Sequence, residues 1–279
     1  MALIVPEVYA ELVREKYEGR SVMRHLSEDL GTIQNTTVGG TVVFPQWSTI
    51  TDAEDMTDFT VETDRLTAVK LAQTSVNAPV KQYGKAIYVR DLEDVTALGN
   101  QINEAAYQTG AVIARKVDSD LFTEALSTTN PIVTTTAMPT DADFMSLFNT
   151  FGDDQDIDTI AGLVINSAII PAFLNSNLFV DATTTTAAAF IGNGIVRNGL
   201  LGFYRGVPVY LSDKETQRTK GTYTTLLLKK NAIAYMEKRG INVEEDRQAM
   251  SGGSNIVSNL IFACKLVRVA DVAVMNSTF

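Results

Sequence analysis

The stretch that decides the fold is residues 92–127, LEDVTALGNQINEAAYQTGAVIARKVDSDLFTEALS. Its apolar residues recur at the spacing of one helix face, and no proline interrupts them. That stripe consists of Leu98, Ile102, Ala105, Ala106, Ile113, Val117, Leu121 and Ala125. The charged residues Glu104, Arg115, Lys116, Asp118 and Glu124 lie mainly off it. The pattern predicts one helix, with Asp91 or Asp94 capping its start, that reaches ~50 Å at ~1.5 Å per residue and suits a strut.

The residues before this helix predict an N-terminal helical region and a long ribbon. Residues 6–30 read as two helices, the second running up to Gly31, and form either a hairpin on the core or an arm on a neighbouring subunit. Residues 37–90 change character and predict a long two-stranded excursion, whose acidic tip carries Asp52, Glu54, Asp55, Asp58, Glu62 and Asp64. Because a two-stranded ribbon alone is marginally stable in water, we expect it to rest on something outside its own chain.

The residues after the helix alternate between strand and helix patterns, which predicts an α/β or α+β unit. Ser127–Thr140 reads as a linker, and Thr140 or Asp141 is expected to cap the short helix that follows. Ile160–Ile165 reads as a buried strand. The other segments are a helix at Ala168–Leu174 capped by Asn166-Ser167, a surface loop at Thr183–Ala189, a turn into a strand at Gly199–Ser212, and strands at Tyr223–Leu228, Ala232–Met236 and Leu260–Leu266.

Composition excludes several classes of protein. The chain has 279 residues, of which 45% are hydrophobic, so wholesale disorder is excluded and one large domain or two modest ones are expected. A formal charge of −10 argues against a nucleic-acid binder, which needs a net basic face. The single cysteine cannot form an internal disulfide. The single histidine excludes most catalytic sites built on a Ser-His-Asp triad and most zinc sites built on several histidines. Without a signal-peptide pattern or an apolar run of ~18 residues, a soluble cytoplasmic protein is expected.

Two short motifs resemble ligand sites and fail on their spacing. Asp154, Asp156 and Asp158 begin like a calcium loop, but Thr159 stands at the glycine position and Ile165 at the glutamate position, so a solvated acidic loop is favoured. Gly192-Asn193-Gly194 begins like a dinucleotide fingerprint, but Arg197 stands at the third glycine, which favours a turn.

The remaining single residues also favour ordinary structural roles. His25 lies on an expected surface helix, and Cys264 in an apolar strand is expected to be an inert buried thiol. The pairs Lys229-Lys230 and Lys238-Arg239 read as small solvated basic spots. The sequence therefore predicts no enzyme and no catalytic, cofactor-binding or metal-ligating residue.

Five segments, taken in order, resemble the major capsid proteins of tailed bacteriophages. They are PEVYAELVREKYEGRSVMRHLS (6–27), GGTVVFPQW (39–47), VKQYGKAIYVRDLE (80–93) with the long helix up to ARKVDSDLFTEAL and its Asp118, GLLGFYRGVPVYLSD (199–213), and INVEEDRQ (241–248). Together they cover nearly the whole chain in the order of that family.

The resemblance implies an α+β fold of the Hong-Kong type. Its parts would be an N-terminal arm (1–38) that contacts neighbours, an extended β-hairpin loop (39–80) over an adjacent subunit, a peripheral domain with a spine helix (81–130), an axial domain (131–239), and the closing strands of the peripheral domain (240–279). Lys70 would be the loop lysine that some relatives crosslink, but no partner asparagine can be matched, so no crosslink is predicted.

The resemblance further implies that many copies form hexamers and pentamers, which close an icosahedral shell around double-stranded DNA without sequence-specific binding. The chain would belong to the virion capsid and assemble in the host cytoplasm, away from membranes, with scaffolding, portal and decoration proteins as further partners. Because no long helical segment precedes the arm, a separate scaffolding protein or a cleaved precursor is expected. Two alternatives remain: an encapsulin-like nanocompartment shell and a carboxylate-dependent hydrolase.

Overall fold

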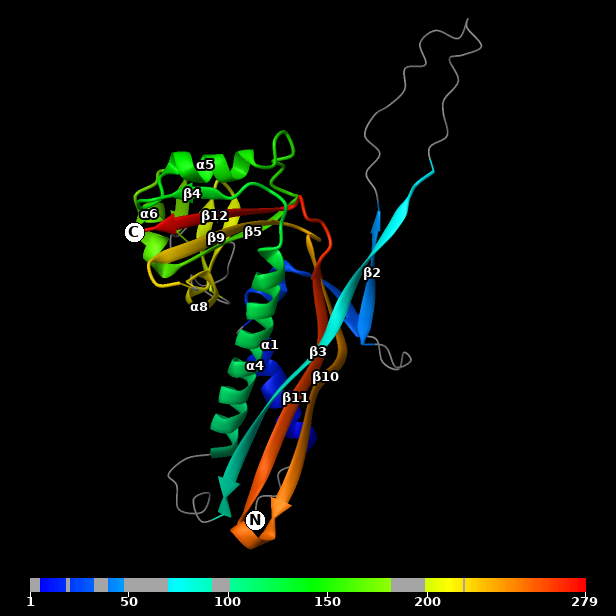
Figure 1. Ribbon diagram of the computed structural model, residues 1–279. Coiled ribbons are helices and arrows are strands. Elements are labelled where there is room, and N and C mark those ends of the chain that lie inside the picture. Colours follow the sequence, from blue (N-terminus) through cyan, green and yellow to red (C-terminus); the bar gives the residue numbers. More distant parts are fainter. Residues whose placement is uncertain are drawn as a thin grey trace, which may run out of the picture.

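The computed structural model describes residues 6–18, 21–32, 40–47, 70–91, 101–181, 199–217 and 219–279. The chain is of the α+β class, with two sheets that lie on different parts of one long helix, α4 (Gln101–Ala125). A compact unit lies at one end of α4, long strands run beside the helix, and a ribbon projects away from both (Figure 1). The acidic tip, Thr183–Ala189, Gly192–Gly194, Asp94 and Leu98 lie outside the described residues.

The first sheet has five strands in the order β1-β10-β11-β3-β2. These strands are β1 (Glu28–Thr32), β10 (Ile233–Gln248), β11 (Gly253–Leu266), β3 (Gln73–Arg90) and β2 (Thr41–Trp47). β10, β11, β3 and β2 pair antiparallel in turn, whereas β1 pairs parallel with β10. Alternate residues of β11, from Ile256 to Leu266, are buried, as the period of two in the sequence predicts.

The helices α4 and α1 (Pro6–Glu18) pack against each other and against this sheet. Tyr9, Val13 and Tyr17, one turn apart on α1, are fully buried within the same chain, which favours the hairpin interpretation of this segment over the arm interpretation. The two helix backbones approach closely at Gly110, where a Cβ would lie 2.8 Å from the carbonyl oxygen of Val13. The glycine therefore permits the contact.

The second sheet has seven strands in the order β4-β12-β9-β5-β8-β7-β6. They are β4 (Val133–Thr135), β12 (Val272–Thr278), β9 (Thr222–Lys229), β5 (Ile160–Ile165), β8 (Val207–Leu211), β7 (Leu200–Tyr204) and β6 (Phe179–Asp181). One face packs on α5 (Asp141–Asn149) and α6 (Ile170–Leu174) through an aromatic cluster of Phe144, Phe148, Phe173 and Tyr204. The short helices are α2 (Met23–Leu26), η1 (Ser167–Ile169), α8 (Asp213–Thr216) and η2 (Ala249–Ser251).

One hydrophobic core joins the two sheets through α4. Val117 and Leu121 of α4 share a buried cluster with Phe262 of the five-stranded sheet and with Leu226 and Val274 of the seven-stranded sheet. The long helix therefore acts as the common support that its apolar stripe predicts. Its described part has 25 residues, or ~37 Å at ~1.5 Å per residue, and Ala125 is its last residue.

Several local expectations are confirmed and others are wrong. Thr140 caps α5 in a reciprocal pair with Asp143, and Asn166 accepts a hydrogen bond from the Ala168 N–H as expected. The second N-terminal helix is a single turn, because residues 28–32 join β10 as a strand. The expected linker contains β4, and Gly199–Ser212 holds the hairpin β7–β8.

The last three strands of the chain are divided between the two sheets. β10 runs continuously through residue 239, because its antiparallel partner β11 extends along most of its length. β12 lies between β4 and β9 in the seven-stranded sheet, so the chain ends in that sheet. The closing residues therefore contribute to both sheets.

Candidate functional site

The residues singled out from the sequence do not come together as a chemical site. In the Asp154–Asp158 loop, the Asp158 N–H donates to Asp156 Oδ1, whereas Asp154 pairs with a distant lysine. No group of three or more His, Cys, Asp or Glu side chains in the described parts of the chain is placed to hold a metal ion. His25 is exposed and lines a hollow of about 260 Å³ with Tyr210. Lys70 is exposed at the start of the described second half of the ribbon.

In the first basic pair Lys230 is exposed as predicted, whereas Lys229 is not. The Lys229 side chain is 7% exposed, its Nζ lies 2.6 Å from Asp154 Oδ2, and it stands over the Phe151 ring. Burial explains the difference, because the end of β9 places this side chain against Asp154 and the Phe151 ring. In the second pair, Arg239 donates to Asn259 Oδ1 at 2.6 Å.

Cys264 is fully buried in β11 facing α4, as predicted. Burial raises the pKa of its thiol to about 12. Because only the thiolate is a good nucleophile, the folded chain is expected to leave a chromogenic disulfide reagent unreacted at pH 8 and to react fully in urea. Rapid reaction of the folded chain would contradict this burial.

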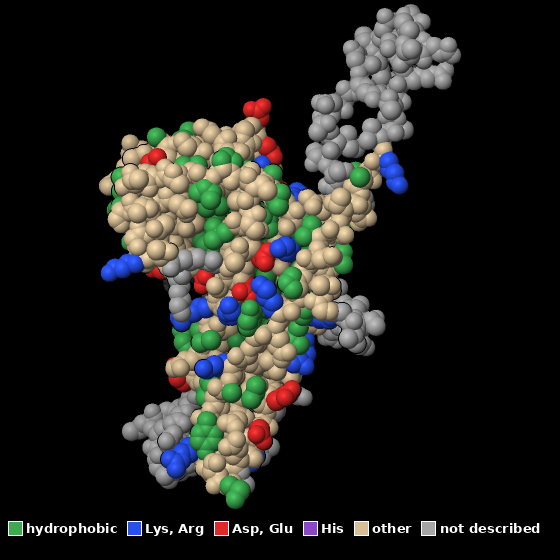
Figure 2. Space-filling model, in the orientation of Figure 1, with side chains coloured by type: hydrophobic (Ala, Val, Ile, Leu, Met, Phe, Trp, Pro, Cys, Tyr) green, Lys and Arg blue, Asp and Glu red, His purple; other side chains and the backbone are tan. Residues whose placement is uncertain are grey.

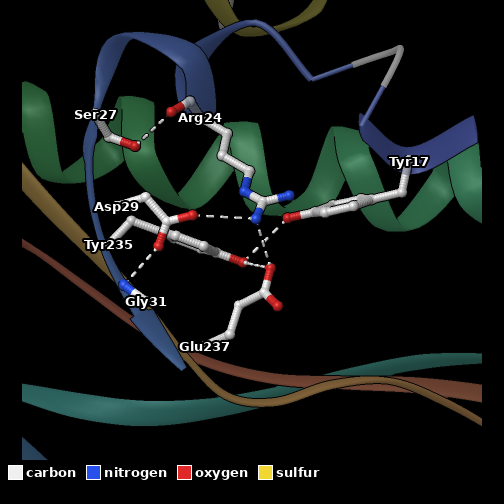
Figure 3. A network of polar contacts seen from close by, with 7 residues as sticks. All are labelled: Tyr17, Arg24, Ser27, Asp29, Gly31, Tyr235 and Glu237. Carbon is white, nitrogen blue, oxygen red and sulfur yellow. Dashed lines mark hydrogen bonds and ion pairs between the residues drawn. The ribbon is translucent and has the colours of Figure 1, made fainter. Parts of the chain in front are cut away.

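A buried polar network joins the N-terminal segment to β10 (Figure 3). The Arg24 guanidinium lies 2.9 Å from Glu237 Oε1 and 3.2 Å from Asp29 Oδ2, and it stands over the rings of Tyr17 and Tyr235. The hydroxyls of the two tyrosines are 3.0 Å apart, and Tyr235 donates to Glu237 at 3.0 Å. Burial raises the pKa of both phenols, so both remain protonated donors at neutral pH.

A second set of ion pairs links α4 to the five-stranded sheet. Asp120 is buried between Lys81 at 3.3 Å and Lys116 at 3.4 Å, and Lys265 of β11 lies 2.8 Å from Glu124. Figure 2 shows basic and acidic side chains interspersed across the middle of the molecule, over the region of α4 and β3. This surface is therefore mixed in charge, without the uniform basic face of a DNA-binding protein.

A cavity lies between β2 of the ribbon, the turn after β9 and the turn before β12. It has a volume of about 670 Å³ and is lined by Gln46 of β2, by the turn that follows β9 and by the turn that precedes β12. Its charged lining residues are Asp154, Asp158, Lys229, Lys230, Arg268 and Asp271. Three of these residues are basic and three are acidic, and Lys229 pairs with Asp154 and Arg268 with Asp271, so the charges of this lining balance.

Apolar side chains are exposed on the ribbon and at the sheet edges. On the ribbon, Val43 is 56% exposed and Leu71 is 48% exposed, whereas Phe44 of the same strand is buried on β10 and β11. At the β6 edge of the seven-stranded sheet, Leu174, Leu178 and Val180 are exposed. These apolar side chains lie on strands and short segments, and none of the described helices is long and apolar enough to cross a membrane.

Solved structures share this architecture. The mature capsid of bacteriophage PhiM1 matches with a TM-score of 0.63 at 12% identity, over 93% of this chain and 87% of that chain. The capsid of Ralstonia phage GP4 matches with a TM-score of 0.64 at 11% identity, over 93% and 91%. A virus-like particle from Pyrococcus furiosus matches with a TM-score of 0.58 at 13% identity, over 96% and 98%. The chain thus has the fold of phage capsid structures, and the expected fold class is confirmed.

Neither a protein-family model nor a curated protein sequence matches the chain. The likeness is carried by the three-dimensional arrangement, because identities of 11–13% leave little of the sequence in common with these structures.

Proposed function

We propose that the chain is the major capsid protein of a tailed bacteriophage. Many copies would form hexamers and pentamers and close an icosahedral shell around double-stranded DNA. The observation that carries this proposal is that the arrangement of two sheets, long helix and projecting ribbon agrees with phage capsid structures over most of the chain. The role is structural rather than enzymatic, and the place of the chain is the virion capsid, assembled in the host cytoplasm.

The ribbon supports an assembling role on physical grounds. Phe44 packs on the same chain, but its neighbour Val43 in β2 and Leu71, just before β3, are exposed to solvent. A neighbouring copy that covers the ribbon would bury these residues and supply the second layer that a two-stranded ribbon lacks. We propose that residues 39–80 lie over an adjacent subunit in this way.

The two sheets support a division of roles between the parts of the subunit. We propose that α1, α4 and the five-stranded sheet form the peripheral part, and that the seven-stranded unit within residues 131–239, completed by β12, forms the axial part. The continuous β10 and the shared core would couple the two parts mechanically. The segment before residue 39 would add contacts to neighbours beyond the internal packing of α1.

The charge of the chain is compatible with a container. With a formal charge of −10 and ion pairs interspersed over α4 and β3, a shell of such subunits would not hold packaged DNA tightly, so other machinery can fill and empty it. Scaffolding, portal and decoration proteins are the further partners that this proposal implies. A nanocompartment shell with a protein cargo is the second candidate, which the match to the Pyrococcus furiosus particle favours.

The proposal is tested by negative-stain electron microscopy and sedimentation velocity of the concentrated protein, alone and with the products of neighbouring genes. Closed shells, or rings of five and six subunits, are the expected result. DNA or DNA-packaging proteins that copurify would support the phage role, whereas an enzyme cargo would support the nanocompartment. A small oligomer that never forms shells under any of these conditions would contradict both.

The ribbon assignment makes a separate prediction. The variant Val43→Asp is expected to keep the melting temperature of the subunit, because the side chain is exposed, and to reduce shell formation at least tenfold, because assembly would bury an unpaired charge. The matched variant Val43→Thr keeps the β-branched shape and should assemble normally. If Val43→Asp formed normal shells, the proposal that the ribbon lies in the subunit interface would be wrong.

A further inference from the structure

A buried pair of carboxyl groups lies where three elements meet. Asp118 of α4 and Glu215 of α8 are 5% and 8% exposed. Asp118 Oδ2 accepts the backbone N–H of Val22 at 2.7 Å, at the entry to α2. α8 follows the strand β8 of the seven-stranded sheet, so the pair joins the N-terminal segment, the long helix and the compact unit.

Asp118 has an unused oxygen in this site. Its Oδ1 atom has no hydrogen-bond partner, and neither carboxyl forms an ion pair with a lysine or arginine of the described residues. Two titratable side chains face Asp118, Glu215 from α8 and Tyr17 from α1, and the backbone N–H groups of Met23 and Arg24 in α2 also act on it. The Arg24 guanidinium is directed to Glu237 and Asp29, as Figure 3 shows, so it does not neutralise Asp118.

These surroundings favour the neutral form of Asp118. Burial, with a smaller contribution from Glu215, raises the pKa of Asp118 to about 7, against the opposing effect of the backbone N–H groups of Val22, Arg24 and Met23. A proton on the unused Oδ1 leaves Oδ2 free to accept the Val22 N–H. When the N-terminal segment separates from α4, the carboxyl meets water and regains its ordinary pKa of 3.8.

We propose that residues 21–32 form a proton-controlled clasp, in which the protonated Asp118 facing Glu215 holds α2 on α4 and the ionised Asp118 loosens it. The segment continues directly into β1, which pairs with the edge of β10. Release of the clasp would therefore expose the β10 edge and free the N-terminal segment from the junction of the two sheets. This conformational control belongs to the subunit itself and does not depend on the shell.

The sign and size of the effect follow from proton linkage. Because the docked state holds a proton that the undocked state has lost, docking weakens as pH rises from about 4 to about 7. The docking equilibrium should fall by up to about tenfold per pH unit in that window, since one proton is exchanged. Above the docked pKa both states are ionised, and the dependence on pH ends.

Hydrogen–deuterium exchange of the full chain tests the clasp. Peptides covering residues 21–32 are followed at pH 5 to 8.5, corrected for intrinsic exchange, with peptides of β11 as the internal reference. The expected result is that protection of 21–32 falls by up to about tenfold per pH unit up to pH 7 and then levels off, while β11 is unchanged. A profile that is flat throughout would overturn the proposal.

Two variants and a matched control assign the effect to the carboxyl pair. Asp118→Asn keeps an oxygen for the Val22 N–H but cannot ionise, so its profile should be flat. Glu215→Gln should move the midpoint to lower pH, because a neighbouring negative charge is removed. Glu124→Gln, on the same helix but paired with Lys265, should retain the native profile. If Asp118→Asn kept the native pH profile, the clasp proposal would be wrong. If Asp118→Asn does not fold, the Glu215→Gln variant decides, and an unshifted midpoint there would contradict the proposal.

Discussion

The variant Arg24→Met is expected to have a free energy of unfolding about 3–5 kcal/mol below that of the native chain. The Arg24 side chain is 13% exposed, and its strongest partner, Glu237, is 8% exposed. Methionine keeps an apolar stem between Tyr17 and Tyr235 but removes the charge, so Glu237 is left buried without a cation. Equilibrium urea unfolding, followed by circular dichroism, measures the loss.

Two further variants show whether the cost comes from the unpaired carboxylate. Adding Glu237→Gln to Arg24→Met removes the uncompensated charge and keeps an acceptor for the Tyr235 hydroxyl, so most of the lost stability should return. The control Arg247→Met breaks a bidentate pair with Asp91, at 2.6 and 2.7 Å, whose members are 48% and 44% exposed. Stability should change little there, because solvent screens the pair. Equal losses at Arg24 and Arg247 would contradict the role assigned to burial.

The elements that the sequence predicts correctly are those whose local pattern agrees with their final environment. The helix stripe of α4 and the alternation in β11 are periodic because each element buries one face. β1 escapes prediction because its sequence, Glu-Asp-Leu-Gly-Thr, is polar and without alternation. Its strand conformation comes from pairing with β10, a contact between segments far apart in the sequence.

The buried polar residues could not be located from the sequence for a related reason. Arg24, Asp118 and Glu237 are of types that usually face solvent, and nothing nearby in the sequence distinguishes them from exposed charges. Each is buried in contact with a partner from an element far away in the sequence. The backbone N–H of Val22, for example, donates to Asp118. The same reasoning predicts a solvated Lys229, whereas in the structure its side chain is buried against Asp154.

Proline at the centre of α4 is expected to cost about 3 kcal/mol or more. Ala111 is buried one residue after Gly110, where α1 and α4 come closest, and its N–H lies well inside the helix. Proline removes the hydrogen bond from that N–H, and its ring clashes with the carbonyl of Tyr107. The resulting kink would separate Tyr17 from Ile113 and Ala114 in the core that joins both sheets.

The position of the proline, rather than its presence in a helix, decides the size of this effect. Ala142→Pro places the ring in the first turn of α5. There the Thr140 side chain accepts from the N–H of Asp143, and the N–H of Ala142 has no partner within the helix to lose. Stability should therefore change little. Thermal unfolding of the unassembled subunits should show a melting temperature at least about 6 °C lower for Ala111→Pro. Because α4 supports both sheets, Ala111→Pro should also fail to form shells. If Ala111→Pro and Ala142→Pro had equal melting temperatures, α4 would not be the common support of the two sheets.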